Sequence, residues 1–122
     1  MRMLLTVGVC VLALTSGALA QPKTTPAYLI AEFDVLDAAS LKKFGEASNA
    51  VVKAHGGQFL SRRSKITSVI GEPPKNVTVI MFESLAKAQA YYQSAEYKAI
   101  VPLRDAGAKY RTYIVEGGDL AQ

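Results

Sequence analysis

The sequence is poor in the residues that usually carry metal, redox or thiol chemistry. Its 122 residues include one cysteine, one histidine and no tryptophan. The cysteine, Cys10, lies in an apolar N-terminal stretch, so the rest of the chain offers no disulfide and no thiol nucleophile. A zinc or copper site needs several ligands at defined spacing. We therefore predict no metal site and no cofactor, with a haem held by the lone histidine as the open alternative.

The excess of positive over negative charge is also small. Lys and Arg total 14 against 10 Asp and Glu, and the only dense cluster is Arg62-Arg63-Ser64-Lys65. A nucleic-acid-binding surface usually shows a basic stripe with interleaved aromatic residues. We therefore predict no nucleic-acid partner and interpret the cluster as a solvated strand face. The sequence also has no phosphate-binding glycine loop, serine triad or CxxC motif.

The N-terminus has the pattern of a secretory signal. Arg2 supplies a positive charge, residues 3–14 are almost all apolar, and Ala18-Leu19-Ala20 provides small residues before a cleavage site. The apolar run is shorter than the roughly 20 residues that span a bilayer. We predict that residues 1–20 are cleaved near Ala20 and that the protein is periplasmic or extracellular, with no membrane contact afterwards. A retained membrane anchor is the alternative.

Alternating side chains and residues with high β-propensity predict the strands. In the first strand, one face would carry Leu29, Ala31, Phe33 and Val35, and the other Tyr28, Ile30, Glu32 and Asp34. A second strand is predicted over residues 58–70, interrupted near Ser64. Residues 77–82 form the clearest strand of the chain, and residues 110–115 form the last.

Apolar residues at helical spacing predict helices between these strands. The first helix ends near Ala54, and its apolar face would consist of Leu41, Phe44, Ser48, Val51 and Val52. The second helix covers residues 85–93 and would pack through Leu85, Ala88 and Tyr92. A third begins at Ser94, and Pro102 should bend or divide it.

The order β-α-β-β-α-β predicts an α+β fold of the ferredoxin-like, split βαβ type. Its antiparallel sheet would carry the helices on one face. The domain would cover residues 27–117, between a disordered tether at 21–26 and a tail at 118–122. Apolar residues occur on both faces of the strands, as with Leu29 and Ile30. Because large exposed apolar patches mark interfaces, we predict a homodimer whose sheets pack face to face.

Several stretches occur in the order typical of one known family. They are Tyr28-Leu29-Ile30, His55-Gly56-Gly57-Gln58-Phe59-Leu60, Val77-Thr78-Val79-Ile80-Met81-Phe82-Glu83-Ser84, Tyr91-Tyr92-Gln93-Ser94-Ala95-Glu96-Tyr97 and Leu103-Arg104. Over about residues 27–117 the chain resembles the family called domain of unknown function 1330, in the dimeric α+β barrel group. The resemblance implies a ferredoxin-like fold that dimerises through its sheets and encloses a cavity.

The resemblance implies no particular reaction. Relatives in the group include cofactor-independent monooxygenases, isomerase-like proteins and haem-binding enzymes, so the fold does not fix the function. The sequence also departs from the family pattern at two places. Arg63-Ser64 stand where two glycines are common, and Met81 stands where an acidic residue is common.

Four residues are candidates for catalysis: His55, Glu32, Asp34 and Tyr97. A histidine can act as a general acid or base near neutral pH, and two neighbouring carboxylates can shift one pKa upward. Each has a structural alternative. His55 could simply end a helix, and the carboxylates could pair with Arg111 or Lys109 across the sheet.

Three residues are candidates for ligand binding: Tyr92, Tyr97 and Arg104. Tyrosines give a cavity apolar walls with hydrogen-bonding tips, although ordinary core packing explains them too. Arg104 could hold an anion or pair with Glu96. The preferred hypothesis is therefore an exported dimer that binds a small, partly apolar organic ligand. The alternative is a cofactor-independent enzyme, of monooxygenase or isomerase type, acting on a small aromatic substrate.

Overall fold

The computed structural model of this chain describes residues 25–118. The predicted signal peptide and most of the predicted tether and tail lie outside these residues. The elements are, in order, β1 (Ala27–Val35), α1 (Ala38–Ala54), β2 (Gln58–Arg62), β3 (Asn76–Phe82), α2 (Leu85–Gln93), α3 (Ala95–Gly107) and β4 (Ala108–Glu116).

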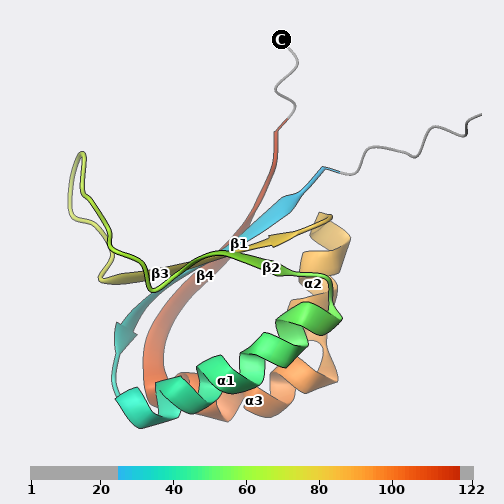
Figure 1. The fold of residues 1–122 in the computed structure, drawn as a ribbon, viewed down its shortest axis with the longest axis horizontal. Helices are drawn as coiled ribbons and strands as arrows, with labels where there is room; N and C mark the ends of the chain where they lie inside the picture. The colour runs from blue at the N-terminus through green and yellow to red at the C-terminus, as the bar shows by residue number, and fades with distance from the viewer. Residues whose placement is uncertain (1–24, 119–122) are drawn as a thin grey trace, which may run out of the picture.

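The strands form one antiparallel sheet in the order β2-β3-β1-β4. Within residues 25–118, all three helices lie on the same side of this sheet, and its other side carries no helix (Figure 1). The predicted α+β, split βαβ architecture is therefore confirmed. We call the helix-covered side the inner face and the opposite side the outer face.

The inner face owes its core to the alternation in β1. Ala27, Leu29, Ala31 and Phe33 are all buried, while the residues between them are not. Phe82 at the end of β3 and Val52 of α1 are the most deeply buried large side chains. Burying such a side chain contributes about 1.5–3 kcal/mol each, so this layer supplies most of the stabilisation of the domain.

Local signals fix both ends of α1. Asp37 caps the N-terminus, since its side chain accepts a hydrogen bond of 2.8 Å from the backbone N–H of Ser40. The helix ends at His55, and Gly56 follows with a φ of 72°, a conformation that glycine adopts without penalty. The predicted apolar face of α1 is confirmed in full, since all five of its residues are buried.

The predicted strand over residues 58–70 is wrong beyond Arg62. Residues 63–75 form an extended arm that projects from the sheet on the side away from the helices (Figure 1). Val69 and Ile70 in this arm are 91% and 94% exposed. Their β-propensity has no effect here because a strand also needs a neighbouring strand to pair with.

Two predictions for the helices also need correction. In α2 the buried aromatic residue is Tyr91, whereas Tyr92 is 40% exposed. Both lie within one turn of the buried Ala88, so helical spacing alone does not choose between them. Helix α3 runs through Pro102 without division. The missing N–H of this exposed proline costs one backbone hydrogen bond, and the packing of α3 against α1 keeps the helix continuous.

The outer face has an apolar part and a charged part. The apolar part, which we call the outer patch, consists of Tyr28, Ile30, Val79, Met81, Tyr113 and Val115. At the other end of β1, Glu32 pairs with Arg111 at 2.8 Å and Asp34 with Lys75 at 3.9 Å. The predicted apolar character of this face therefore holds for one end of the sheet only.

Candidate functional site

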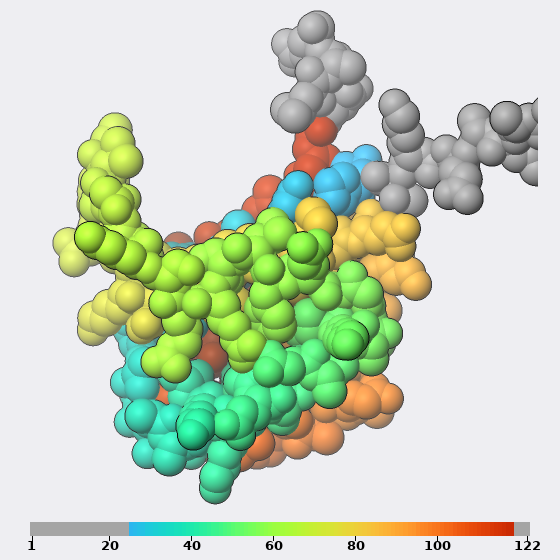
Figure 2. All heavy atoms as spheres, in the orientation of Figure 1, coloured from blue at the N-terminus to red at the C-terminus, as the bar shows by residue number. Residues whose placement is uncertain are grey.

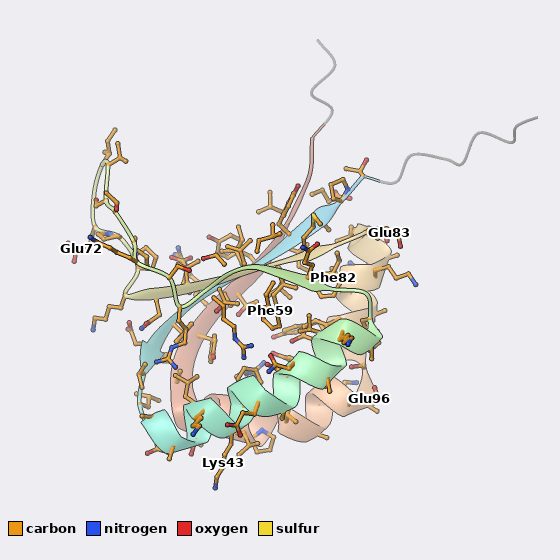
Figure 3. The ribbon with its side chains drawn as sticks, in the orientation of Figure 1. Lys43, Phe59, Glu72, Phe82, Glu83 and Glu96 are labelled. Carbon is orange, nitrogen blue, oxygen red and sulfur yellow. The ribbon has the colours of Figure 1, made fainter. Side chains whose placement is uncertain are left out.

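A cavity of about 240 Å³ lies between the inner face of the sheet and helices α1 and α3. The cavity opens at a hollow between β2 and α1 (Figure 2). Its apolar walls are formed by Leu29, Phe33, Phe44, Phe59 and Ile80. Phe59 projects from β2 into the space between the sheet and α1 (Figure 3). The site is therefore predominantly aromatic and aliphatic, as expected for a pocket that takes an organic molecule.

Tyrosines from three elements extend the aromatic wall to its polar end. Tyr97 of α3 lies edge-on to Tyr91 of α2, with ring centroids 5.0 Å apart. Tyr110 of β4 lies 4.9 Å from Phe33 and 6.0 Å from Phe44. Edge-to-face and tilted contacts of this kind hold aromatic rings in fixed orientations. The wall is thus a rigid surface rather than a set of independent side chains.

Arg104 joins two of the tyrosines at the α3 side of the cavity. Its Nη1 donates hydrogen bonds to Tyr97 Oη at 3.0 Å and to Tyr92 Oη at 3.3 Å. Its Nε donates to Asp105 Oδ1 at 2.9 Å, and only 19% of the side chain is exposed. The pairing of Arg104 with Glu96, which the sequence offered as an alternative, is wrong, because eight residues of helix separate the two by about 12 Å.

Three further cations stand around the cavity: Lys42 of α1, Arg62 of β2 and Arg63. The guanidinium of Arg62 lies 4.5 Å from the ring centroid of Phe59 and donates a hydrogen bond of 2.8 Å to Gly45 O. It also donates to Asn49 Oδ1. These contacts tie the end of β2 to the exposed side of α1. They also hold the charge of Arg62 in place beside the cavity.

A bulge in β2 puts Arg62 in this position. The pairing of β2 with β3 shifts between Phe59 and Ser61, which makes Leu60 an extra residue. A bulge moves every later side chain to the opposite face. Arg62 therefore shares the inner face with Phe59 and lines the cavity. The residue is exposed, so the interpretation of the basic cluster as solvated agrees with its exposure but does not include its place beside the cavity.

Burial controls the protonation of the tyrosines. Desolvation raises the pKa of Tyr91 and of Tyr97, and the hydrogen bond from Arg104 only partly opposes the shift at Tyr97. Desolvation also raises the pKa of Tyr110 to about 12, although Arg104, Arg63 and Arg62 act in the opposite direction. All three phenols are therefore neutral at physiological pH and can offer hydrogen bonds to a ligand.

Only one of the four catalytic candidates lines the cavity, namely Tyr97. Glu32 and Asp34 lie on the outer face in the ion pairs described above. His55 ends α1 and lies edge-on to Tyr91, with ring centroids 6.1 Å apart. The structure therefore does not bring these four together as one acid-base site.

The ligand-binding candidates lie closer together. Tyr97 and Arg104 line the cavity, and Tyr92 contacts Arg104 from its exposed side. Phe44 and Phe59 were not predicted as wall residues, and Tyr110 was not among the three ligand-binding candidates. The alternation of β4 and the apolar face of α1 carried the signal for Tyr110 and Phe44, but only the known pairing of strands shows that these faces meet.

The described residues show neither a metal cluster nor a membrane-crossing helix. Within residues 25–118, no three His, Cys, Asp or Glu side chains gather closely enough to hold a metal ion. Over the same part of the chain, each helix is too short or too polar to cross a bilayer.

The sheet order and the single-sided helices define a ferredoxin-like α+β domain with a cavity on its inner face. The chain belongs to the family described as domain of unknown function (DUF1330), which matches residues 26–118. This confirms the resemblance drawn from the sequence motifs. A search of the curated proteins finds no significant match.

Three solved structures share the fold at low sequence identity. RPA0582, a protein of unknown function from Rhodopseudomonas palustris, is 16% identical with a TM-score of 0.65, over 78% of this chain and 84% of that one. SnoaB, a cofactor-independent oxygenase from Streptomyces nogalater, is 12% identical with a TM-score of 0.57, over 81% and 100%. A dimeric protein of unknown function and ferredoxin-like fold from Bacteroides fragilis is 15% identical with a TM-score of 0.52, over 75% and 95%.

Proposed function

We propose that this protein binds a small, partly apolar organic ligand in the cavity between its sheet and helices. The observation that carries the proposal is the aromatic wall of a cavity of about 240 Å³. An engineered apolar cavity of about 150 Å³ binds benzene. The present cavity is larger, so one substituted ring or two fused rings match its size.

The polar groups of the cavity support an organic ligand rather than a purely hydrocarbon one. Ser48, Thr78 and Thr112 line it together with the neutral tyrosines. A few fixed polar groups in an apolar pocket orient a ligand and provide specificity. A ring with one or two polar substituents satisfies both kinds of wall.

Filling the cavity tests this proposal. Ala31 lies in the middle of β1, lines the cavity and is 8% exposed. Thermal shift and calorimetry with 2-naphthol, 1,4-naphthoquinone, 2-naphthamide and 2-naphthoate should identify at least one ligand. We expect Ala31→Leu to abolish its binding, because the added carbons occupy the cavity.

Ala106→Leu is the matched control, since Ala106 is exposed on α3 and does not line the cavity. This variant should bind like the original protein. The proposal is overturned if none of the four compounds binds, or if Ala31→Leu binds them unchanged.

A second candidate function is cofactor-independent oxygenation of an activated aromatic substrate. The fold is shared with SnoaB, a cofactor-independent oxygenase. The guanidinium of Arg104 and the hydroxyl of Tyr97, which accepts a hydrogen bond from it, can also donate hydrogen bonds to an oxyanion of the substrate. Protein-dependent uptake of ¹⁸O from ¹⁸O₂ into the product of naphthalene-1,4-diol, measured by mass spectrometry against a protein-free blank, would support this function. An uptake equal to the blank would leave the binding function alone.

We also propose that the protein acts as a homodimer joined through the outer patch. The apolar side chains of this patch lie on a face that none of the described helices covers (Figure 1), and Val115 is 46% exposed. The Bacteroides fragilis protein of the same fold is dimeric. A second copy would remove this apolar surface from water.

Export completes the proposed function. The charge, apolar run and small residues of positions 1–20 are the support for it. Expression of the full chain in a bacterium followed by N-terminal sequencing should show a mature protein that begins at Gln21. Recovery of the intact N-terminus from the cytoplasm would contradict export.

A further inference from the structure

The residues that line the cavity include cations and no anions. Lys42, Arg62, Arg63 and Arg104 are among its lining residues, and none of the lining residues is an aspartate or glutamate. The labelled carboxylates Glu72, Glu83 and Glu96 point outward, away from the space between sheet and helices (Figure 3). The net charge of the lining residues is therefore positive.

Two of these cations lack an internal counterion. Lys42 lies 4.0 Å from Glu46 and Arg104 lies 2.9 Å from Asp105. Within residues 25–118, neither Arg62 nor Arg63 forms an ion pair with a carboxylate. Both arginines are exposed and line the cavity, so an anion from solution can reach their unpaired charges and is attracted by them.

Arg63 occupies a backbone position that suits glycine better. Its φ of 53° is the only positive value at a non-glycine residue within residues 25–118. The left-handed conformation costs an ordinary residue about 1–2 kcal/mol. The chain therefore has an arginine at this position despite the conformational cost, and the arginine side chain lies beside the cavity.

Arg62 is held ready for a ligand by the bonds described above. Its contacts with Gly45, Asn49 and Phe59 use neutral partners, so they fix the guanidinium without neutralising it. A preorganised cation loses little conformational entropy when a ligand binds. The aromatic wall begins directly next to this charge, at Phe59.

We propose that the ligand of the cavity is an aromatic anion, such as an aryl carboxylate, with its ring on the Phe44–Phe59 wall and its charge beside Arg62 and Arg63. This inference rests on the proposed binding function and names its ligand class. A guanidinium suits this role because it donates charge-assisted hydrogen bonds to both oxygens of a carboxylate.

A charged and a neutral compound of the same shape test the inference. We use 2-naphthoate and 2-naphthamide and measure both affinities by calorimetry with the full domain. The wild type should bind the carboxylate at least about tenfold more tightly than the amide. Arg63→Gly should lower naphthoate affinity about five- to tenfold and leave naphthamide affinity unchanged.

The fold of Arg63→Gly can be checked independently. Since glycine relieves the backbone penalty at this position, the melting temperature should stay the same or rise. Lys65→Gly is the matched control, because it removes the same charge from the same arm at a residue that does not line the cavity. Its preference for naphthoate should equal that of the wild type.

The outcomes separate the two levels of the proposal. Equal affinity for carboxylate and amide would overturn the anion inference while leaving the binding function intact. Equal losses in Arg63→Gly and Lys65→Gly would also overturn it, since net charge alone would then explain the effect. If none of 2-naphthoate, 2-naphthamide, 2-naphthol and 1,4-naphthoquinone binds, the binding function is overturned, and the anion inference is overturned with it.

Discussion

Tyr97 and Arg104 form the polar centre of the α3 side of the cavity. Tyr97 is 6% exposed, and its hydroxyl accepts the 3.0 Å hydrogen bond from Arg104. Hydrogen bonds to charged groups contribute about 1.5–3 kcal/mol, and a buried donor left without its partner is costly. The pair therefore fixes the position of the guanidinium as well as stabilising the fold.

Removing this hydroxyl should destabilise the domain. We expect Tyr97→Phe to lower the free energy of unfolding by about 2 kcal/mol, measured by urea denaturation. Tyr92→Phe is the comparison, because its bond to Arg104 is 3.3 Å long and more exposed. An equal loss in both variants would show that the Tyr97 bond has no special weight.

The Glu32–Arg111 pair makes a pH-dependent contribution. The hydrogen bond from Arg111 holds the pKa of Glu32 below its ordinary value of 4.5. A depressed carboxyl pKa stabilises the fold above the unfolded-state pKa and loses that effect as pH falls through the folded-state pKa. The melting temperature of the wild type should thus exceed that of Glu32→Gln at pH 6.

The difference in melting temperature should then shrink as the pH falls below about 4.5. Because the Arg111 side chain is 77% exposed, we expect a small effect that high salt reduces further. A difference that stays constant between pH 6 and pH 3 would show that the charge of Glu32 is not involved.

At the scale of elements, the contact between the start of α1 and the end of α3 depends on Gly107. Its carbonyl accepts hydrogen bonds from the N–H groups of Leu36 and Asp37, at 2.9 and 3.1 Å. A Cβ atom at Gly107 would lie 2.6 Å from Leu41 N and 2.7 Å from Leu41 Cα. Both of these are backbone atoms, which cannot move as a flexible side chain can.

Gly107→Ala should accordingly force α1 and α3 apart. We expect a loss of about 1–3 kcal/mol in the free energy of unfolding, measured by thermal or urea denaturation. Gly118→Ala is the control, because a Cβ there meets nothing within 4 Å. If Gly107→Ala proves as stable as the control, the close approach of the helices is not a constraint.

The sequence predicted most elements because their signals are local. Alternation marks β1, a run of apolar and β-branched residues marks β3, and the spacing of apolar residues marks α1. The end of β2 escaped prediction because a bulge is defined by the partner strand, and the sequence of β2 alone does not reveal Leu60 as the extra residue. The same bulge concealed Arg62 as part of the site.

For the molecule as a whole, the outer patch sets the expected oligomeric state. Ile30 lies at its centre, in register with Val79 of β3 and Tyr113 of β4. We expect the wild type to sediment as a dimer and Ile30→Lys to sediment as a monomer, since a buried lysine charge opposes association. Analytical ultracentrifugation over a range of concentrations measures both.

The control for this prediction is Leu36→Lys. Leu36 is 66% exposed and lies after β1, outside the outer patch. This variant should remain as dimeric as the wild type. A wild type that is monomeric at every concentration would contradict the proposed interface.

The function of the whole molecule was the feature least predictable from the sequence. Tyr97 and Arg104 were identified because tyrosine and arginine suggest ligand contacts by type alone. His55, Glu32 and Asp34 were candidates for the same reason, yet they lie at a helix end and on the outer face. Residue type does not tell whether a side chain lies on the face of the sheet that carries the cavity. The strand order and pairing are needed for that.

The position of the cavity on the inner face has a consequence for a paired molecule. The proposed dimer contact is on the outer face, so two intact sheets would separate the two cavities. Occupancy of one copy would then leave its twin unaffected. Titration should give a hyperbolic saturation curve with a Hill coefficient of about 1 and one equivalent per chain.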